Sequence, residues 1–273
     1  MILILLACSE SGLKDVWELE VLTYNVHGLP SVVTGDDTTA RVEKIAPILE
    51  SYELIGLQED FIEENHEIFQ QSLEHPTQTW FSKTLEDRFY GSGLSLFSLL
   101  KLVELHEQHY TSCFGTVDHS SDCLASKGFV RARLELSAGI EIDVYNTHLE
   151  AGGASQDTEV KAQQIAELVS ELQQGSEGRS VIVMGDTNLQ ISKSDELELL
   201  NQLKEEVQLV DCCEQLQCAQ PQFIDRIFFR GSSDLQVTPE YWSEQSEFVD
   251  EQGFPLSDHP AISCGLTFSL NGQ

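Results

Sequence analysis

The chain has 273 residues, of which 41% are hydrophobic, enough for the core of one large domain or of two small ones. It carries 46 acidic and 15 basic residues, a formal net charge of −31. No cluster of three or more Lys or Arg occurs in the sequence, which argues against the basic footprint that nucleic-acid binding normally requires. We interpret the acidity as a solvated surface suited to salty or extracellular conditions, with recruitment of divalent cations as a local alternative.

The N-terminal segment MILILLACSE is apolar up to Cys8 and is too short to span a bilayer. It lacks the positive region of a complete signal peptide, but Leu5-Leu6-Ala7-Cys8 resembles a bacterial lipobox. We therefore expect lipidation of Cys8, a true start upstream, and an exported protein, either secreted or anchored as an envelope lipoprotein. Residues 1–18 would then be a signal remnant and linker. The alternative is a chance apolar start.

The predicted strands cover residues 19–26, 54–59, 93–98, 128–137, 140–149, 180–186, 223–229 and 261–270. Alternation in VRARLEL and IEIDVYN is typical of strands with one solvated face. Amphipathic helices are predicted at 39–52, 159–174 and 195–206. This interleaving favours two packed sheets with helices outside. A doubly wound parallel sheet would show more continuous apolar strands and a Gly-rich phosphate turn, and the sequence has no G-x-G-x-x-G or Walker motif.

Six cysteines follow Cys8, and an even number in an exported protein indicates disulfides, although several pairings are open. Cys113 and Cys123 flank one polar loop and are the predicted bridge. No Cys-x-x-Cys or Cys/His metal spacing is present, so the sequence does not predict a structural zinc site.

Polar side chains recur at or within the ends of the predicted strands. In VIVMGDTNL, a glycine precedes Asp186 and Asn188, two residues that face the same side of an extended end. Taken singly, each such residue has an ordinary explanation, such as a turn former, a core histidine or, for Asp225, an ion-pair partner of Arg226. Together they indicate a ligand site where strand ends converge. The set is Asn25, Gln58, Glu59, Asp60, Asn146, His148, Asp186, Asn188, Asp225, Asp258 and His259.

Carboxylate and amide oxygens are the ligands that suit Mg²⁺. Histidines move protons near neutral pH. The sequence contains no GxSxG, reactive-cysteine or HExxH motif. This inventory favours metal-assisted attack of water on phosphorus.

Seven segments in order resemble the endonuclease/exonuclease/phosphatase (DNase I-like) superfamily: LTYNVHGLP, IGLQED, YGSGLSLFS, YNTHLEAGG, VMGDTNL, DRIFF and SDHPA. The resemblance spans roughly residues 19 to 268. It implies a four-layer α/β/β/α sandwich of two packed mixed β-sheets, and a single catalytic domain over residues 19–273.

The resemblance also implies how the phosphate and the metal are held. Asn25 and Glu59 would hold the catalytic Mg²⁺, with Mn²⁺ as an alternative ion, and Glu59 would be a direct ligand. Asp186 and Asn188 would position the nucleophile and the phosphate. His148 would bind the phosphate and assist the leaving oxygen.

Proton transfer is implied at the C-terminal motif. His259 would be the general base, oriented by Asp225, and Asp258 would support the metal or water side. A binding module on the same scaffold is the non-enzymatic alternative, but every expected catalytic residue type is present.

Within the superfamily, CFGTVDHSSDCLASKGFVRARLEL resembles the neutral sphingomyelinase-like branch. Lys127 is the candidate contact to a phosphate or headgroup, and the alternative is an ordinary exposed lysine. Two departures from the nuclease pattern argue against DNA as the substrate. Asp60 follows Glu59, and Ser92 stands where deoxyribonucleases carry a carboxylate. We therefore expect an exported Mg²⁺-dependent phosphodiesterase for a lipid or small phosphodiester, with a secreted endonuclease or an inositol-phosphate phosphatase as alternatives. Membrane contact through residues 98–106 is expected to be weak, and no obligate protein partner is inferred.

Overall fold

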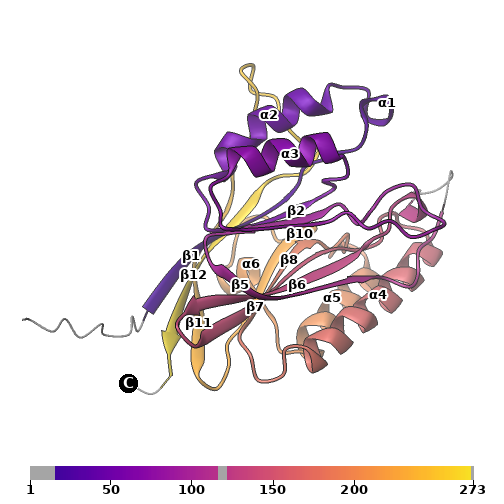
Figure 1. Ribbon diagram of the computed structural model, residues 1–273. Coiled ribbons are helices and arrows are strands. Elements are labelled where there is room, and N and C mark those ends of the chain that lie inside the picture. The colour runs from indigo at the N-terminus through magenta and orange to yellow at the C-terminus, as the bar shows by residue number, and fades with distance from the viewer. Residues whose placement is uncertain (1–15, 116–121, 272–273) are drawn as a thin grey trace, which may run out of the picture.

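Two six-stranded β-sheets pack face to face in the computed structural model, which describes residues 16–115 and 122–271 (Figure 1). The first sheet has the order β11 (Leu235–Glu244), β12 (Ile262–Leu270), β1 (Val16–Asn25), β2 (Leu54–Gln58), β4 (Leu94–Ser98) and β3 (Thr77–Phe81). The second has the order β5 (Lys101–His109), β6 (Gly128–Ser137), β7 (Ile140–His148), β8 (Val181–Asp186), β10 (Asp225–Arg230) and β9 (Val210–Asp211). Each sheet is mixed, because β1–β2 and β7–β8 are parallel while the other pairs are antiparallel.

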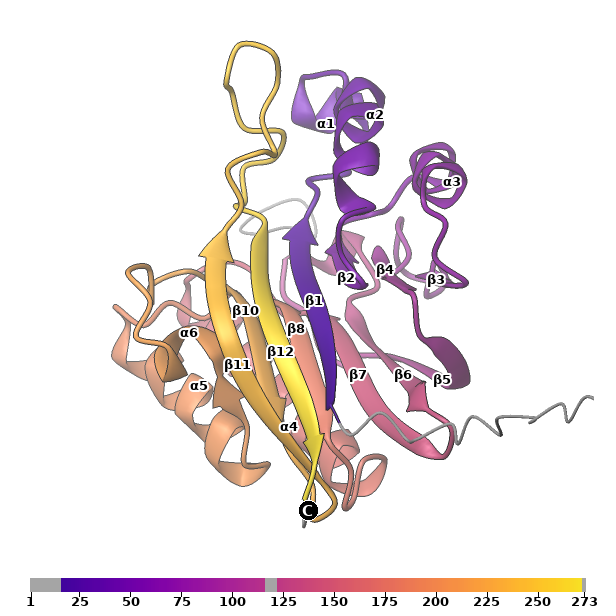
Figure 2. The same cartoon turned by 90° about the vertical axis from the view of Figure 1, so that its left-hand side faces the viewer.

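Helices cover the two outer faces. α1 (Ser31–Thr34), α2 (Thr38–Leu49) and α3 (Glu63–Ser72) lie beside the first sheet, and α4 (Ser155–Gln174) and α5 (Ser194–Glu206) lie beside the second (Figures 1 and 2). α6 (Cys212–Gln215) and a 3-10 turn, η1 (Asp122–Leu124), are short connections. The fold is therefore the expected four-layer α/β/β/α sandwich.

Three apolar clusters hold these layers together. The cluster between the sheets includes Val21, Leu54, Val144 and Met184. The other two join α2 and α3 to the first sheet and α4 and α5 to the second. Apolar residues on both faces of the central strands explain their continuous hydrophobic runs.

The predicted strands and helices are all present, but β3, β5, β11 and α3 and the short elements α1, β9 and α6 were not predicted. β11 contains Pro239, and its pairing with β12 shifts register between Pro239 and Tyr241. It lies at a sheet edge, where proline is tolerated and the sequence signal is weak. Residues 98–106, for which weak membrane contact was predicted, mostly form the edge strand β5, and the contact itself stays a prediction.

β1 begins at Val16, ahead of residue 19 where the domain start was expected, and the domain boundaries stay a prediction. Residues 1–15, and with them Cys8, lie outside the described residues. No helix in the described part of the chain is long and apolar enough to cross a membrane.

All six cysteines after Cys8 are paired. Cys113 and Cys123 form one bridge, and Cys213 pairs with Cys218. Cys212, at the start of α6, is joined to Cys264 in β12, so this bridge crosslinks the two sheets.

Candidate active site

Strand ends from both sheets meet at one edge of the sandwich. In the parallel pair β1–β2, Asn25 is opposite Gln58, which places Glu59 just beyond the strand. In the second sheet, His148 is opposite Asp186. β10 runs antiparallel to β8, so its first residue, Asp225, also pairs with Asp186.

Asn25 links the two sheets at this edge. Its Nδ2 donates to Glu59 Oε1 at 3.0 Å and lies 3.2 Å from Asp186 Oδ2, a bond that spans 161 positions of the sequence. Its Oδ1 accepts from the backbone N–H of His27 at 3.0 Å. Asn25 is fully buried, so each of these bonds is shielded from water.

Three non-glycine residues at this edge adopt left-handed backbone conformations: His27 with φ 48°, Glu59 with φ 60° and Asn188 with φ 51°. Such conformations cost free energy, on the order of 1–3 kcal/mol each, and persist only where surrounding contacts enforce them. Their clustering here is typical of a functional site.

The glycine in Gly185-Asp186-Thr187-Asn188 has a steric cause. Gly185 has φ 145°, and a Cβ there would lie 1.9 Å from Thr147 O in the adjacent strand β7. Beyond it, Asp186 Oδ1 accepts from Asn188 N at 3.0 Å, and Asn188 Nδ2 donates to Leu149 O at 3.1 Å. This turn brings both polar residues to the pocket together.

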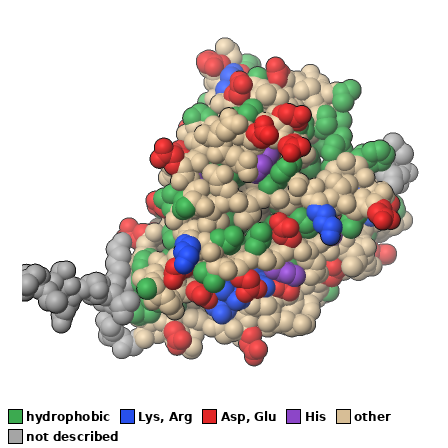
Figure 3. All heavy atoms as spheres, in the orientation of Figure 1, with side chains coloured by type: hydrophobic (Ala, Val, Ile, Leu, Met, Phe, Trp, Pro, Cys, Tyr) green, Lys and Arg blue, Asp and Glu red, His purple; other side chains and the backbone are tan. Residues whose placement is uncertain are grey.

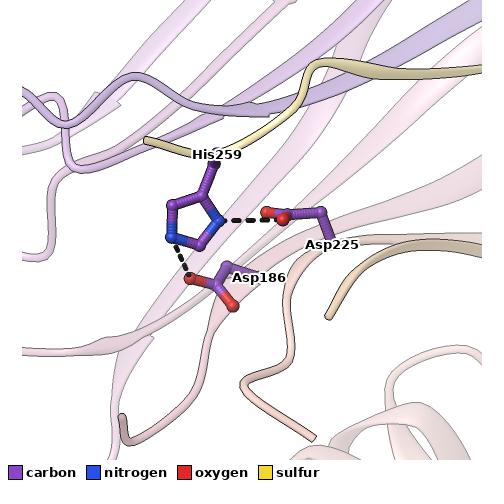
Figure 4. A group of neighbouring side chains, drawn as sticks. All are labelled: Asp186, Asp225 and His259. Carbon is purple, nitrogen blue, oxygen red and sulfur yellow. Dashed lines mark hydrogen bonds and ion pairs between the residues drawn. The ribbon is translucent and has the colours of Figure 1, made fainter. Parts of the chain in front are cut away.

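His259 and Asp225 form a hydrogen-bonded pair, with 2.8 Å between Nδ1 and Oδ2 (Figure 4). The other ring nitrogen, Nε2, lies 3.7 Å from Asp186 Oδ2 (Figure 4). Arg226 instead pairs with Asp211 at 2.6 Å, which accounts for its charge without Asp225. Asp225 is therefore the partner of His259.

The pKa values of this pair follow from burial and close carboxylates. Burial by itself would lower the pKa of His259, but the hydrogen bond and charge of Asp225, with help from Asp186, raise it to about 10. Burial, and then the charge of Asp186, raise the pKa of Asp225 to about 7. Without a bound cation, the charged imidazolium is the favoured form of His259.

The pKa of His148 is shifted in the opposite direction from that of His259. It is buried, its Nε2 lies 3.3 Å from Asp186 Oδ2, and its Nδ1 is buried without a hydrogen bond from the described residues. Burial, together with the charges of Lys127 and His259, holds the pKa of His148 well below its usual value. A neutral ring whose Nε2–H donates to Asp186 fits this environment.

Glu59 is well placed to bind a divalent cation. Its Oε2 is buried and receives no hydrogen bond from the described residues, and His27 Nδ1 lies 3.9 Å away. Burial raises the pKa of this carboxyl. A bound cation would compensate both the unpaired oxygen and the buried charge, so the donor set of Glu59 and Asn25 fits Mg²⁺.

A second group of possible ligand atoms belongs to Asp186, Asp225 and His259, whose donor atoms lie within 4.8 Å of one another (Figure 4). In this group the His259–Asp225 hydrogen bond already uses one nitrogen and one oxygen. The arrangement suits proton transfer better than metal binding.

Asp258 and Lys127 differ in their exposure. Asp258 is 61% exposed and pairs with His27 Nδ1 at 3.2 Å, so it is at the rim of the site. Lys127 is not an ordinary exposed lysine: it is buried, with Nζ 2.5 Å from Asp122 Oδ1 and 2.8 Å from Leu149 O. Burial opposes its charge, but Asp122 raises the pKa of Lys127, so it presents a fixed positive charge to the pocket.

These groups surround a pocket of about 360 Å³. Its polar floor includes Glu59, His148, Asp186, Asn188 and His259. Its wall is largely apolar and is formed by Leu29, Val33, Phe61, Tyr90, Leu124, Ala125 and Ala151. A phosphate at the floor would thus have apolar surface beside it.

Sequence reasoning missed the role of Asp60. Its carboxylate accepts from Ser95 Oγ at 2.5 Å and contacts His66 Nδ1 at 2.6 Å, and its carbonyl accepts from Trp80 Nε1 at 2.8 Å. These contacts anchor the backbone directly after Glu59. An acid following the metal-ligand candidate was visible in the sequence, but its partners on α3, β3 and β4 were not.

Comparisons with known proteins agree with this architecture. The model of Endonuclease/Exonuclease/phosphatase family 2 matches residues 22–220. A sphingomyelinase from Mycobacterium tuberculosis is 29% identical over 274 residues, covering 92% of this chain and 53% of the relative. The chain thus spans about half the length of this curated relative.

Solved structures share the fold. A mutant beta toxin from Staphylococcus aureus with bound magnesium ions superposes with a TM-score of 0.68 at 16% identity, over 91% of this chain and 99% of that one. TDP2 from D. rerio, complexed with a single-strand DNA product, gives a TM-score of 0.70 at 19% identity, over 91% and 98%.

Proposed function

Because the chain belongs to endonuclease/exonuclease/phosphatase family 2, we propose that it is an Mg²⁺-dependent phosphodiesterase that hydrolyses a lipid phosphodiester of the sphingomyelin type. The observation that carries the proposal is the meeting of Glu59, Asp186 and the His259–Asp225 pair in one pocket. The similarity to a sphingomyelinase over 92% of this chain supports the substrate class.

Glu59 and Asn25 would hold the cation at the floor of the pocket. When bound, Mg²⁺ would withdraw charge from a phosphate oxygen and make phosphorus easier to attack. The charge of Lys127 and the side-chain amide of Asn188 lie along the same pocket and are suited to hold other phosphate oxygens. The hydrogen bond from Asn25 Nδ2 to Glu59 Oε1 holds this carboxylate at the site.

His259 would remove the proton from the attacking water. The proton passes to Nε2, while Nδ1–H stays hydrogen-bonded to Asp225, which fixes the tautomer and stabilises the imidazolium formed. The new bond joins the water oxygen to phosphorus, and the bond from phosphorus to the leaving alkoxide breaks. His148 lines the same pocket and donates its Nε2–H to Asp186, so it would hold that carboxylate in place while the leaving alkoxide takes a proton from water.

This role requires neutral His259, although its pKa is raised to about 10 in the cation-free protein. A divalent cation in the same pocket disfavours a second positive charge and would lower that pKa toward the working range. Proton transfer and cation binding would therefore be coupled in this site.

The apolar wall and the overall charge favour a lipid over a polyanion. A net charge of −31 repels nucleic acid at long range but has little effect on a zwitterionic headgroup. Nucleic acid remains the second candidate because TDP2, with a DNA product, shares the fold.

Export belongs to the same proposal. Pairing of all six cysteines from Cys113 to Cys264 supports an oxidising compartment. Anchoring through a lipidated Cys8 is a hypothesis that mass spectrometry of envelope protein would test.

A side-by-side assay tests the proposed activity. The purified protein with Mg²⁺ is incubated with sphingomyelin vesicles, plasmid DNA and an inositol phosphate, each with and without EDTA. We expect hydrolysis of sphingomyelin, loss in EDTA, and loss in His259→Ala. Hydrolysis of DNA without hydrolysis of sphingomyelin would establish the second candidate instead.

A further inference from the structure

α1 is a short helix whose two valines are largely exposed. Val32 is 91% exposed and Val33 58% exposed, and none of the four residues of α1 is buried. The stretch from Gly28 to Gly35 contains no charged residue. Exposed apolar clusters of this kind on an otherwise acidic protein mark interaction surfaces.

Phe89 is a second exposed apolar side chain, 77% accessible to solvent. Its backbone is held in place, because Phe89 N and Tyr90 N both donate to Leu124 O, at 2.9 and 3.0 Å. Tyr90 and Leu124 line the pocket, so Phe89 projects outward from the segment that forms one pocket wall.

α1 and Phe89 both lie at the mouth of the same pocket. Val33 lines the pocket while remaining largely exposed, which makes α1 continuous with the opposite wall. Figure 3 shows hydrophobic side chains gathered over α1 and again across a notch at the same edge of the molecule. Apolar surface therefore runs from the outer rim, through the wall, to the polar floor.

We propose that this rim, made of Val32, Val33 and Phe89, docks onto a phosphocholine-rich lipid surface and thereby presents lipid headgroups to the pocket. This inference rests on the proposed function and names the surface through which the site meets its substrate. The rim side chains enter the interfacial region of the bilayer, while the phosphodiester reaches the floor beside Glu59 and His259.

The negative charge of the protein favours a zwitterionic lipid surface over an anionic one. The chain carries −31 overall, and Asp36 and Asp37 immediately follow the uncharged stretch of α1. Anionic bilayers would repel this face, whereas a zwitterionic surface allows the apolar rim to approach.

β5 is the competing surface, because Val103 and Leu105 are 47% and 41% exposed. They sit among charged neighbours, since Glu104 between them pairs with Arg131 and Arg133. None of these β5 residues lines the pocket. Docking through β5 would not place the pocket mouth against the lipid.

The test measures vesicle binding in EDTA, so that no hydrolysis is needed. Wild-type protein is sedimented with vesicles of phosphatidylcholine and sphingomyelin, and separately with vesicles that include phosphatidylglycerol. Val32→Asp and Phe89→Asp change the rim without touching the pocket lining, and Val103→Asp is the matched control on β5. Turnover of a soluble chromogenic phosphodiester with Mg²⁺ is measured in parallel.

We expect each rim variant to bind zwitterionic vesicles about tenfold more weakly, as for loss of one buried apolar side chain. We also expect phosphatidylglycerol to weaken wild-type binding. Soluble turnover should be unchanged in both rim variants, and Val103→Asp should bind like wild type. Unchanged vesicle binding in the rim variants, or a loss confined to Val103→Asp, overturns the docking surface. Failure of the proposed activity would appear separately, as wild-type binding without hydrolysis.

Discussion

Replacing Asp225 with asparagine tests the chemistry of the site most directly. The substitution keeps the size of the side chain and a hydrogen-bonding oxygen, but it removes the negative charge that lies 2.8 Å from His259 Nδ1. Asp225 is not needed to neutralise Arg226, because Arg226 pairs with Asp211.

The magnitude follows from the pKa of His259, which is raised from 6.5 to about 10. At 1.36 kcal/mol for each pH unit, this difference corresponds to about 5 kcal/mol in favour of the imidazolium. Asp225 is the leading cause of the increase, while Asp186 would remain in the variant. We therefore expect the pKa of His259 to fall by about two pH units or more.

Two measurements report this change. NMR titration of His259 in EDTA should show the lower pKa directly. With Mg²⁺, the acidic limb of the pH–rate profile should move to lower pH, because neutral His259 is then present at lower pH. The plateau rate should nevertheless fall by roughly 10²–10⁴, since the imidazolium formed during attack is no longer stabilised.

Stability should change with pH in a defined window. The raised pKa of His259 stabilises the fold fully below pH 6.5, and this contribution is lost as the pH rises through about 10. The cost of burying charged Asp225 grows only up to about pH 7. Between pH 7 and 10, the melting temperature of wild type should therefore fall by more than that of Asp225→Asn.

Asp211→Asn is the control. It breaks a buried ion pair with Arg226 in the same strand pair, so it should lower the melting temperature without moving the pH–rate profile. If Asp225→Asn behaves like this control, and the pKa of His259 is unchanged, the assignment of Asp225 as the orienting carboxylate is wrong.

Further predictions concern the metal, its support and a disulfide. Glu59→Gln should weaken Mg²⁺ binding by orders of magnitude in calorimetry, as for loss of a direct anionic ligand, and full activity of wild type in EDTA would contradict this role. Asp60→Ala should lower the free energy of unfolding, measured by urea denaturation, by about 2–4 kcal/mol, because Ser95 and His66 lose their buried acceptor. It should also weaken Mg²⁺ binding, and an unchanged Mg²⁺ affinity would show that the role of Asp60 is purely structural. Replacing Cys113 and Cys123 by serine should lower the free energy of unfolding by about 1–3 kcal/mol, and six free thiols in protein isolated from the envelope would contradict the bridge.

Much of the fold is encoded in local patterns. Alternating and continuous apolar runs located the central strands, and the polar residues at their ends marked Asn25, Glu59, Asp186 and His259 as site candidates. These signals are readable because side-chain period and turn chemistry are properties of a few consecutive residues. The elements that were missed have weak local signals: β11 contains Pro239 at a sheet edge, and α3 is mostly polar and buries little more than Phe69, Asn65 and His66.

Only the tertiary structure shows how the candidates meet. Asn25 bonds to Asp186 across 161 positions, and this depends on the packing of two sheets whose strand order no local pattern encodes. The same packing buries Glu59 Oε2 without a hydrogen-bond donor among the described residues, and pairs Asp225 with His259 rather than Arg226. Burial and distance decide charge states, because the free energy of a carboxylate or an imidazolium depends on neighbours that are distant in the sequence.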